Sequence, residues 1–551
     1  MGGVYKYLAV PSNLFLLCSF FTLASSSVYA AEAPGITLKY AVETAVKNSP
    51  QIVIQSIGVD IARAEEQNAG APFDAMLTSS AALQRMRGYE LPDDLQDFGE
   101  AAHVVDFMTT KKNNTELKTG LAKLYRSGLY TDFSVTLQST KDFVQNQDLE
   151  WNVFPNFPAL LPDGSVDIDD YSPAYPSVVR ALLNIPLLKM RGKYNLPAAN
   201  ETSKRLSREA SEASLKHEIA KIIRNVVNQY WAYSATQARL KYTINSKEQV
   251  ASWINRSSKT NGTSGSKEMA HLRGFKTQLV VEEAKAKAAH TAALNALSKA
   301  MGISVAEAGK LGEAIDRYPL DWSQVLQTLD DNAVEKRWSD LATKNRFDLK
   351  AADLKLQAAK AIHLGAKNDK RAKLDLALIL EQNGIKAGGD GLGARFDSLS
   401  EGTSDLGYTA LLSYAYPLGN SKAKSLVTKT KYGEMQAHVQ NQNAHRTVGL
   451  AINTATSNFR ASLEGLAAAL KQTEHYVDAQ NAVNRQGKIK RSEIFDLVAM
   501  ETSRLNANLN HINALQSVAN SLTAAHFETG TLIVNANNLM EISIQDLISL
   551  P

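Results

Sequence analysis

The sequence predicts an α+β chain in which one unit of strands and very long helices occurs twice. Two stretches, 262–302 and 487–530, share the same plan, because each begins and ends with glycine and contains no proline. In the second stretch Leu505, Leu509 and Ile512 recur at spacings of three and four, which is typical of a helix with one apolar face. We interpret this repetition as an internal duplication.

The spacing of other landmarks supports a duplicated chain with one insertion. Gly302 and Gly530 are 228 positions apart, and Pro186 and Pro417, each of which ends a strand-like segment, are 231 apart. The helices that open the two halves are instead offset by 297 positions, from Asn48-Ser49-Pro50 to Asn345-Arg346-Phe347. We therefore place about 66 extra residues in the first half, as an insertion at about 88–175 on the strand side.

The sequence pattern of the first half predicts one helix followed by several strands. Apolar residues recur with helical spacing in 36–70, and a weak alternation of apolar and polar residues follows at 77–83. Stronger alternation at 117–125 and 129–138 flanks a Ser-Gly pair, the pattern of a β-hairpin. A further strand is expected at 179–185.

Long helices then alternate with strands through the rest of the chain. No proline interrupts 201–247, which as a helix would be about 70 Å long. After the helix 338–368, leucines at every second position from 374 to 380 indicate a strand, and alternation at 408–416 indicates another. A second very long helix is expected at about 421–484.

The amino terminus predicts a secretory signal peptide. Residues 1–30 contain Lys6 as their only charge, then an apolar run, and Ala30 ends a segment suitable for cleavage. Cleavage there would remove Cys18, the only cysteine.

The sequence divides the chain into five predicted segments. They are a signal peptide (1–30), a first repeat (31–302), a linker (303–337), a second repeat (338–530) and a C-terminal tail (531–551).

Composition and motifs argue against several classes of protein. The net charge of +4 comes from mixed acidic and basic residues without a basic cluster, so no nucleic-acid partner is expected. A mature chain without cysteine has no disulfide and no thiolate metal site. HExxH and GxSxG motifs are absent, and we expect no helix after the glycine-rich stretch 388–393 that could bind a nucleotide phosphate. We therefore expect no enzyme, no cofactor and no metal.

The order of these elements resembles the TolC-type outer membrane efflux protein family, over essentially the whole mature chain. The resemblance is carried by six local features in the family's order. They are Leu38-x-x-Ala41-Val42 with Asn48-Ser49-Pro50, Pro186-Leu187, Gln229-Tyr230-Trp231, the glycine-bounded block 262–302, Pro417-Leu418, and the block 487–530.

The resemblance implies an α+β membrane protein that forms a homotrimer. Each subunit would contribute four strands to one shared transmembrane β-barrel of twelve strands, in contact with outer membrane lipid, and its coiled-coil helices to a long α-barrel across the periplasm. The sequence offers up to six strands per subunit, so which four enter the barrel stays open. The implied function is a passive exit duct that docks onto a periplasmic adaptor protein and an inner-membrane pump.

The resemblance also implies a gate at the periplasmic mouth. Glu493 and Asp496 occupy the positions of an acidic pair that would form a ring of carboxylates, although acids in a solvated first helical turn need no such role. Glu268 matches an acidic gate residue of the first hairpin. The family's aromatic and arginine partners are missing, and three cations could replace them, or Glu268 could be a plain surface acid. These cations are Lys488, Lys490 and Arg491.

Two alternatives to a drug efflux duct stay open. A type I secretion duct for proteins would have the same architecture. A soluble periplasmic coiled-coil scaffold would have the long helices without the barrel.

Overall fold

The computed structural model describes residues 35–90, 108–145, 173–261, 267–318, 331–389, 391–485, 494–533 and 550–551. Within these ranges the chain forms six strands and two very long helices, with shorter helices between them. In chain order the elements are α1 (Leu38–Asn48), α2 (Pro50–Gly70), the 3₁₀-helix η1 (Ala71–Phe73), β1 (Met76–Glu90), β2 (Met108–Leu124), β3 (Tyr130–Gln145), β4 (Ala174–Pro186), α3 (Leu196–Asn261), α4 (Lys267–Met301), α5 (Val305–Ala308), α7 (Asp331–Asn345), α8 (Phe347–Asp369), β5 (Lys373–Ala387), α9 (Gly391–Asp397), β6 (Gly407–Ala415), α10 (Ser421–Arg485) and α11 (Ile494–Thr529).

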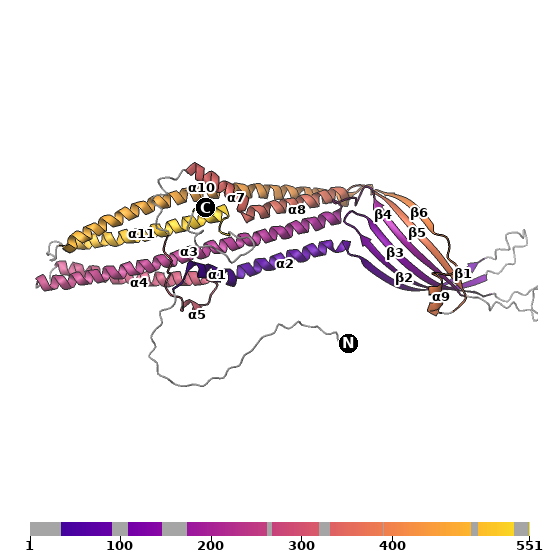
Figure 1. Cartoon of the computed structure of the whole chain (residues 1–551), viewed down its shortest axis with the longest axis horizontal. Coiled ribbons are helices and arrows are strands. Elements are labelled where there is room, and N and C mark those ends of the chain that lie inside the picture. Colours follow the sequence, from indigo (N-terminus) through magenta and orange to yellow (C-terminus); the bar gives the residue numbers. More distant parts are fainter. Residues whose placement is uncertain are drawn as a thin grey trace, which may run out of the picture.

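The described part of the molecule is elongated, with the sheet at one end and the helices extending away from it (Figure 1). Helices α3 and α10 have 66 and 65 residues, and α3 extends beyond its predicted limits at both ends. At 1.5 Å per residue each is about 100 Å long. Their far ends lie together with the starts of α4 and α11, so both helical hairpins reach the same tip (Figure 1).

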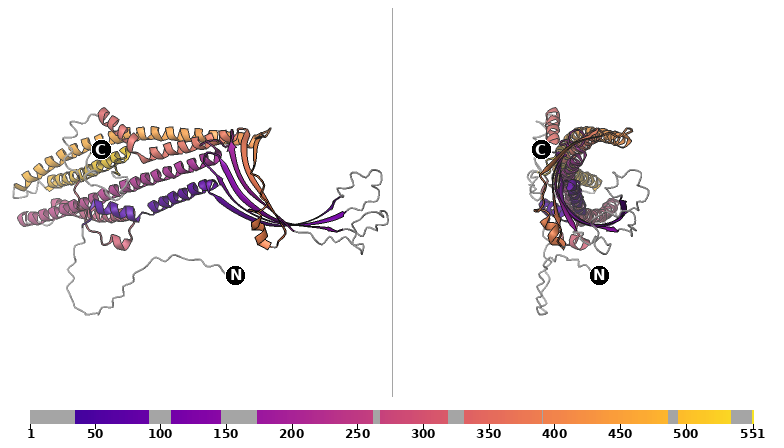
Figure 2. Two further views of the ribbon diagram at one scale, coloured as in Figure 1. Left: turned by 45° about the vertical axis from the view of Figure 1, so that its right-hand side comes forward. Right: turned by 90° about the vertical axis from the view of Figure 1, so that its right-hand side faces the viewer.

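Near the sheet, four helices form one curved layer. Helix α2 packs against α3, α3 against α8, and α8 against α10. Seen along the long axis, the helices and the sheet follow the same open arc (Figure 2). The helices α2 and α10 therefore form the two edges of this layer.

An aromatic cluster fastens the segment after α5 to the middle of α3. The Tyr230 hydroxyl donates to the carboxylate of Asp316 at 2.8 Å, and the Tyr318 ring stacks on Trp231 with 4.8 Å between ring centroids. Tyr230 is completely buried. The aromatic motif of α3 thus secures the connection between the two halves of the chain.

The two returning helices end in the same way. Gly302 and Gly530 have positive φ angles of 70° and 74°, which glycine adopts without steric cost, and each ends its helix. A Cβ atom on Gly302 would lie 3.0 Å from the carbonyl oxygen of Asn48, and one on Gly530 would lie 2.9 Å from the carbonyl carbon of Asn345. These equivalent contacts support the duplication, which stays an interpretation.

The strands form one antiparallel sheet in the order β1-β2-β3-β4-β5-β6. The predicted strands are all present, and all six pair in one sheet, whereas the family resemblance implies four barrel strands per chain. The hairpin β2–β3, which lies in the predicted insertion, pairs with β1 on one side and β4 on the other. Residues 91–107 and 146–172 of that insertion lie outside the described residues.

The glycine-rich stretch near 390 departs from the sequence prediction. The sequence predicts no phosphate-binding helix there, and the structure contains a short helix, α9, that begins at Gly391 within the stretch. The next turn lies against the sheet, where the Ser177 hydroxyl donates to the Ser398 carbonyl at 2.9 Å. The sequence analysis missed this helix because long-range packing on the sheet, rather than local propensity, stabilises its seven residues.

Candidate functional site

One face of the sheet is apolar across its whole width. Successive side chains of a strand point to opposite faces, so the pairing register identifies the residues that share a face. A row that crosses all six strands contains no charged or strongly polar side chain. Its members are Leu77, Leu121, Phe133, Ala181, Leu380 and Tyr408.

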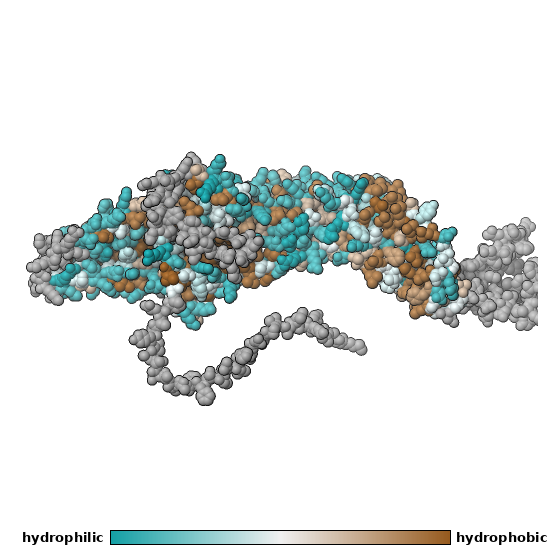
Figure 3. Space-filling model, viewed as in Figure 1, coloured by the Kyte–Doolittle hydropathy of each residue, from teal (hydrophilic) through white to brown (hydrophobic). Residues whose placement is uncertain are grey.

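These apolar side chains are exposed rather than buried. Leu77, Phe133 and Tyr408 are 73%, 52% and 86% exposed. Figure 3 shows apolar residues gathered over the sheet, whereas the helical part is largely hydrophilic. A groove of about 610 Å³ on this face is lined mainly by apolar side chains from β2 to β6. An apolar surface of this extent normally contacts another protein or a membrane.

The opposite face of the same sheet carries charged and polar cross-strand pairs. Arg180 on β4 forms an ion pair with its cross-strand partner Glu381 at 3.1 Å. On the neighbouring strands, the Gln138 amide donates to Glu116 at 3.2 Å. The sheet is therefore amphipathic, with one face suited to an apolar solvent and the other to water.

The helical tip brings together the starts of α4 and α11, which carry two of the predicted gate residues. The ring of His271 on α4 lies 4.8 Å from that of Phe495 on α11. Glu268 is half-buried in the first turn of α4, and Asp496 is exposed in the first turn of α11. Acidic side chains are favourable at these positions because helix N-termini carry partial positive charge.

The other predicted gate residues lie outside the described residues. They are Lys488, Lys490, Arg491 and Glu493. The acidic ring and the links from Glu268 to the neighbouring cations therefore stay predictions.

Behind the tip, the structure contains a buried charge that the sequence analysis missed. Glu501 is 0% exposed, and it accepts hydrogen bonds from Ser246 on α3 at 2.6 Å and from Arg504 at 2.6 and 2.9 Å. The sequence does indicate this burial, because Glu501 lies four residues before Leu505 and so falls on the apolar face of the helix. A buried carboxylate is tolerated only when it is paired and hydrogen-bonded, so this cluster joins α11 firmly to α3.

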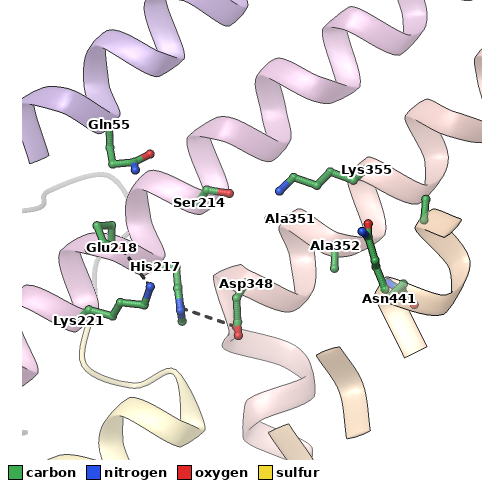
Figure 4. A pocket seen from close by; sticks show the side chains of 12 residues that line it. Gln55, Ser214, His217, Glu218, Lys221, Asp348, Ala351, Ala352, Lys355 and Asn441 are labelled. Carbon is green, nitrogen blue, oxygen red and sulfur yellow. Dashed lines mark hydrogen bonds and ion pairs between the residues drawn. The ribbon is translucent and has the colours of Figure 1, made fainter. Parts of the chain in front are cut away.

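A cavity of about 310 Å³ lies where the four-helix layer curves (Figure 4). It is lined by side chains from α2, α3, α8 and α10, including Gln55, His217, Lys355 and Asn441. Because both edge helices contribute, we place the cavity on the concave face of the arc. Its polar lining indicates that this face is hydrated.

Two ion pairs lie at this cavity, His217 with Asp348 and Lys221 with Glu218. His217 Nδ1 lies 3.8 Å from Asp348, whose carboxylate also accepts hydrogen bonds from Arg346 at 2.8 and 2.9 Å. Burial lowers the pKa of His217 more than Asp348 raises it. Burial opposes the charge on Asp348, but its hydrogen bonds and proximity to Arg346 outweigh this and lower its pKa.

Arg346 joins three helices. Besides Asp348 on α8 it contacts the carboxylate of Glu528 on α11, which also lies 3.4 Å from Arg224 on α3. The Arg346 side chain is only 7% exposed. These ion pairs therefore hold the helices together. Within the described residues, no group of three or more His, Cys, Asp or Glu side chains could hold a metal ion.

No helix in the described part of the chain combines the length and the apolar character needed to cross a membrane. No protein-family model and no curated protein matches the sequence.

Several solved structures match the fold along most of the chain. The Campylobacter jejuni CmeC outer membrane channel covers 94% of this chain and 94% of its own, with 13% identity and a TM-score of 0.55. The open state of the Neisseria gonorrhoeae MtrE outer membrane channel covers 92% and 93%, with 14% identity and a TM-score of 0.54. The Vibrio cholerae outer membrane protein VceC covers 90% and 96%, with 13% identity and a TM-score of 0.53. The chain therefore has the fold of TolC-type outer membrane channels, as the sequence resemblance predicted.

Proposed function

We propose that this protein is the outer membrane channel subunit of an export system and forms a passive exit duct. Its sheet would lie in the outer membrane, and its helices would extend through the periplasm. The observation that carries the proposal is the amphipathic sheet, in which the Leu77–Tyr408 row is exposed on one face while Arg180 and Glu381 lie on the other. Lipid would contact the apolar face, and the polar face would line a water-filled passage.

Assembly into a closed ring is supported by the edges of both layers. In the sheet, β1 and β6 are the edge strands, each paired on one side only. An exposed strand edge is normally paired or covered, and joining β1 of one copy to β6 of the next would remove both edges. The resemblance implies three copies.

The helical layer carries matching apolar edges. On α2, Ile54, Ile57 and Ile61 are more than half exposed and lie at spacings of three and four. On α10, Tyr432 and Val439 are also more than half exposed. Contact between α2 of one copy and α10 of the next would bury both stripes, which supports the same head-to-tail ring as the sheet.

The helical tip is the proposed docking point for other proteins. A periplasmic adaptor would bind there and connect the duct to an inner-membrane pump, which would supply the energy. The exposed Asp496 at the start of α11 supports an acidic mouth that attracts cations. Both small-molecule efflux and type I secretion fit this arrangement, and no catalytic role is proposed.

A soluble scaffold is the alternative, and imaging of the detergent-purified particle separates the two. A duct should appear as a hollow threefold cylinder and should stay with outer membranes after a carbonate wash. A monomeric particle released by the wash would support the scaffold instead.

A pair of variants on α2 tests the ring contact itself. Ile57→Glu places a charge on the apolar edge and should convert the assembled particle into monomers. Gln55→Glu lies on the same helix but lines the concave cavity, so it should leave assembly unchanged. Equal assembly of both variants would contradict the proposed contact.

A further inference from the structure

A short helix covers one end of the apolar face of the sheet. Helix α9 (Gly391–Asp397) contacts β3, β4 and β5 at the end of the sheet that lies away from the long helices (Figure 1). On β3, Phe133 is 52% exposed, whereas Leu137, which lies four residues further along on the same face, is 4% exposed. Ser177, the cross-strand partner of Leu137 on β4, is 2% exposed. The helix and the turn after it therefore bury this part of the apolar face.

Contacts before and after the helix fix it to the sheet. The hydroxyl of the buried Tyr175 on β4 donates to the Gly389 carbonyl at 3.0 Å, just before α9. Just after α9, the Ser398 carbonyl oxygen would lie 1.8 Å from a Cβ atom on Gly384 of β5. The absence of a side chain at Gly384 thus lets the turn lie directly on the strand.

Helix α9 has one buried side and one exposed apolar side. Ala394 and the following Ser398, four residues apart, are 5% and 0% exposed. Leu392 and Phe396, also four residues apart, are 62% and 55% exposed. Residues two positions apart in a helix point in directions that differ by about 200°. The exposed pair therefore points away from the sheet.

The helix adds height to the apolar surface where β5 leaves it short. The leucines of β5 on the apolar face end at Leu380, and the next residues on that face are Gln382 and Gly384. From Leu374 to Leu380 the strand rises about 15 Å along the membrane normal at a tilt of about 40°, whereas the apolar band of an outer-membrane sheet is about 25 Å tall. Ser398 lies over Gly384, and a helix is about 10 Å across, so α9 supplies the missing height.

We propose that α9 enters the outer leaflet of the outer membrane and places Leu392 and Phe396 among the acyl chains of its lipids. This rests on the proposed function, in which the apolar face of the sheet meets lipid. The exposed pair continues that face. The main contacts of α9 are with β3, β4 and β5, and not with the edge strands β1 and β6 where a neighbouring copy would join. Lipid is therefore the occupant that fits this surface.

Charged groups around α9 limit the depth at which it lies. Asp397 lies 3.5 Å from Lys386, which also pairs with Glu401 at 2.6 Å, and both acidic side chains are more than half exposed. Charged side chains are costly in the hydrocarbon centre of a membrane. An amphipathic helix with charged flanks lies instead at the boundary of headgroups and acyl chains, with its apolar side buried by about 5–10 Å.

The test is quenching of fluorophores on the full-length protein in liposomes. Leu392→Cys and Phe396→Cys, each in a Cys18→Ser background, would carry a small fluorophore, and the lipids would carry a nitroxide either near the headgroup or near the end of an acyl chain. Both positions are exposed, so these substitutions leave the packing on the sheet intact. Each fluorophore should lose more fluorescence to the shallow nitroxide than to the deep one.

Two matched positions serve as controls. A fluorophore at Leu380→Cys on the sheet should lose more fluorescence to the deep nitroxide. One at Ser400→Cys, in the exposed turn after α9, should lose little to either nitroxide. Equal quenching at Ser400 and Phe396 would overturn the inference, because it would show no preference of the apolar side for lipid.

Quenching at Leu380 without quenching at Leu392 and Phe396 would also overturn the inference, while leaving the sheet in lipid. Labelling of the two α9 cysteines by a water-soluble thiol reagent would then identify water as the occupant, and protection from the reagent would identify a neighbouring protein chain. Absence of quenching at every position, Leu380 included, would instead overturn the proposed function.

Discussion

The sheet and the helices of this chain place their apolar side chains in opposite ways. In the helical part, the large aromatic residues Trp253 and Phe459 are 1% and 0% exposed. In the sheet, Phe133 and Tyr408 are more than half exposed. The same physical preference gives both patterns when the helices fold in water and one face of the sheet meets lipid.

Charged side chains show the complementary difference. In the helical part Arg346 is buried with its partners Asp348 and Glu528, whereas the sheet pair Arg180 and Glu381 is about 40% exposed. The comparison separates charges that are buried among their partners from charges that are exposed on the sheet.

Replacing the buried cation of the helical part should have the largest effect. Arg346→Ala leaves Asp348 and Glu528 without their buried partner, which typically costs about 3–5 kcal/mol. The temperature at which the helical circular dichroism of the purified protein is lost should fall clearly. Arg205→Ala, which removes the exposed pair with Glu209, should cost about 1 kcal/mol or less. Similar losses in both variants would contradict the structural role of Arg346.

A charge on the apolar face of the sheet should prevent stable membrane insertion. Phe133→Arg would place a cation in lipid, at a cost of about 2–4 kcal/mol near the middle of the membrane. The amount of protein retained in outer membranes after a carbonate wash should decrease. Thr136→Arg lies on the opposite face of β3 and should be tolerated. Equal retention of the two variants would show that the two faces do not meet different solvents.

Acidification should destabilise the helical part through His217. Burial lowers the pKa of His217 below its ordinary value of 6.5, so the unfolded chain binds the proton more readily than the folded chain does. The resulting stability is present above pH 6.5 and is lost as the pH falls below it. Measured from pH 7.5 to 5.5, the drop in melting temperature should be smaller in His217→Gln than in the wild type. The exposed His475→Gln should keep the full drop.

Charge at the tip should affect conduction and leave stability almost unchanged. Asp496 is exposed, so Asp496→Asn combined with Glu493→Gln should lower the melting temperature only slightly, through the lost interaction with the helix N-terminus. If these residues form an acidic mouth, block of the single-channel current by divalent cations should weaken several-fold. Unchanged block would refute the acidic ring.

Much of the fold could be predicted from local sequence patterns. Alternation identified every strand of the sheet, and the glycines at 302 and 530 marked the ends of α4 and α11. The order of the strands could not be predicted in this way, because alternation does not reveal which strands are neighbours. The helix α9 was missed for a similar reason, since its stability depends on packing against distant residues.

The candidate site was less predictable than the fold. The apolar positions of the strands were visible, but the register was needed to show that Leu77, Phe133 and Tyr408 lie in one row. The apolar edge of α2 was hard to predict from the sequence. Ile54 and Ile57 form a second apolar surface on a helix that already has one facing its neighbours. Burial of Glu501 depends on the position of Ser246, which is 255 residues away.

Accessibility along β5 tests the central claim most directly. The only cysteine is Cys18, so single cysteines can be introduced in a Cys18→Ser background. In intact outer membranes, a water-soluble thiol reagent should label cysteines at Ala377 and Glu381 on the polar face, and should fail to label those at Leu378 and Leu380. Equal labelling at all four positions would contradict a sheet with one face in lipid and the other in water.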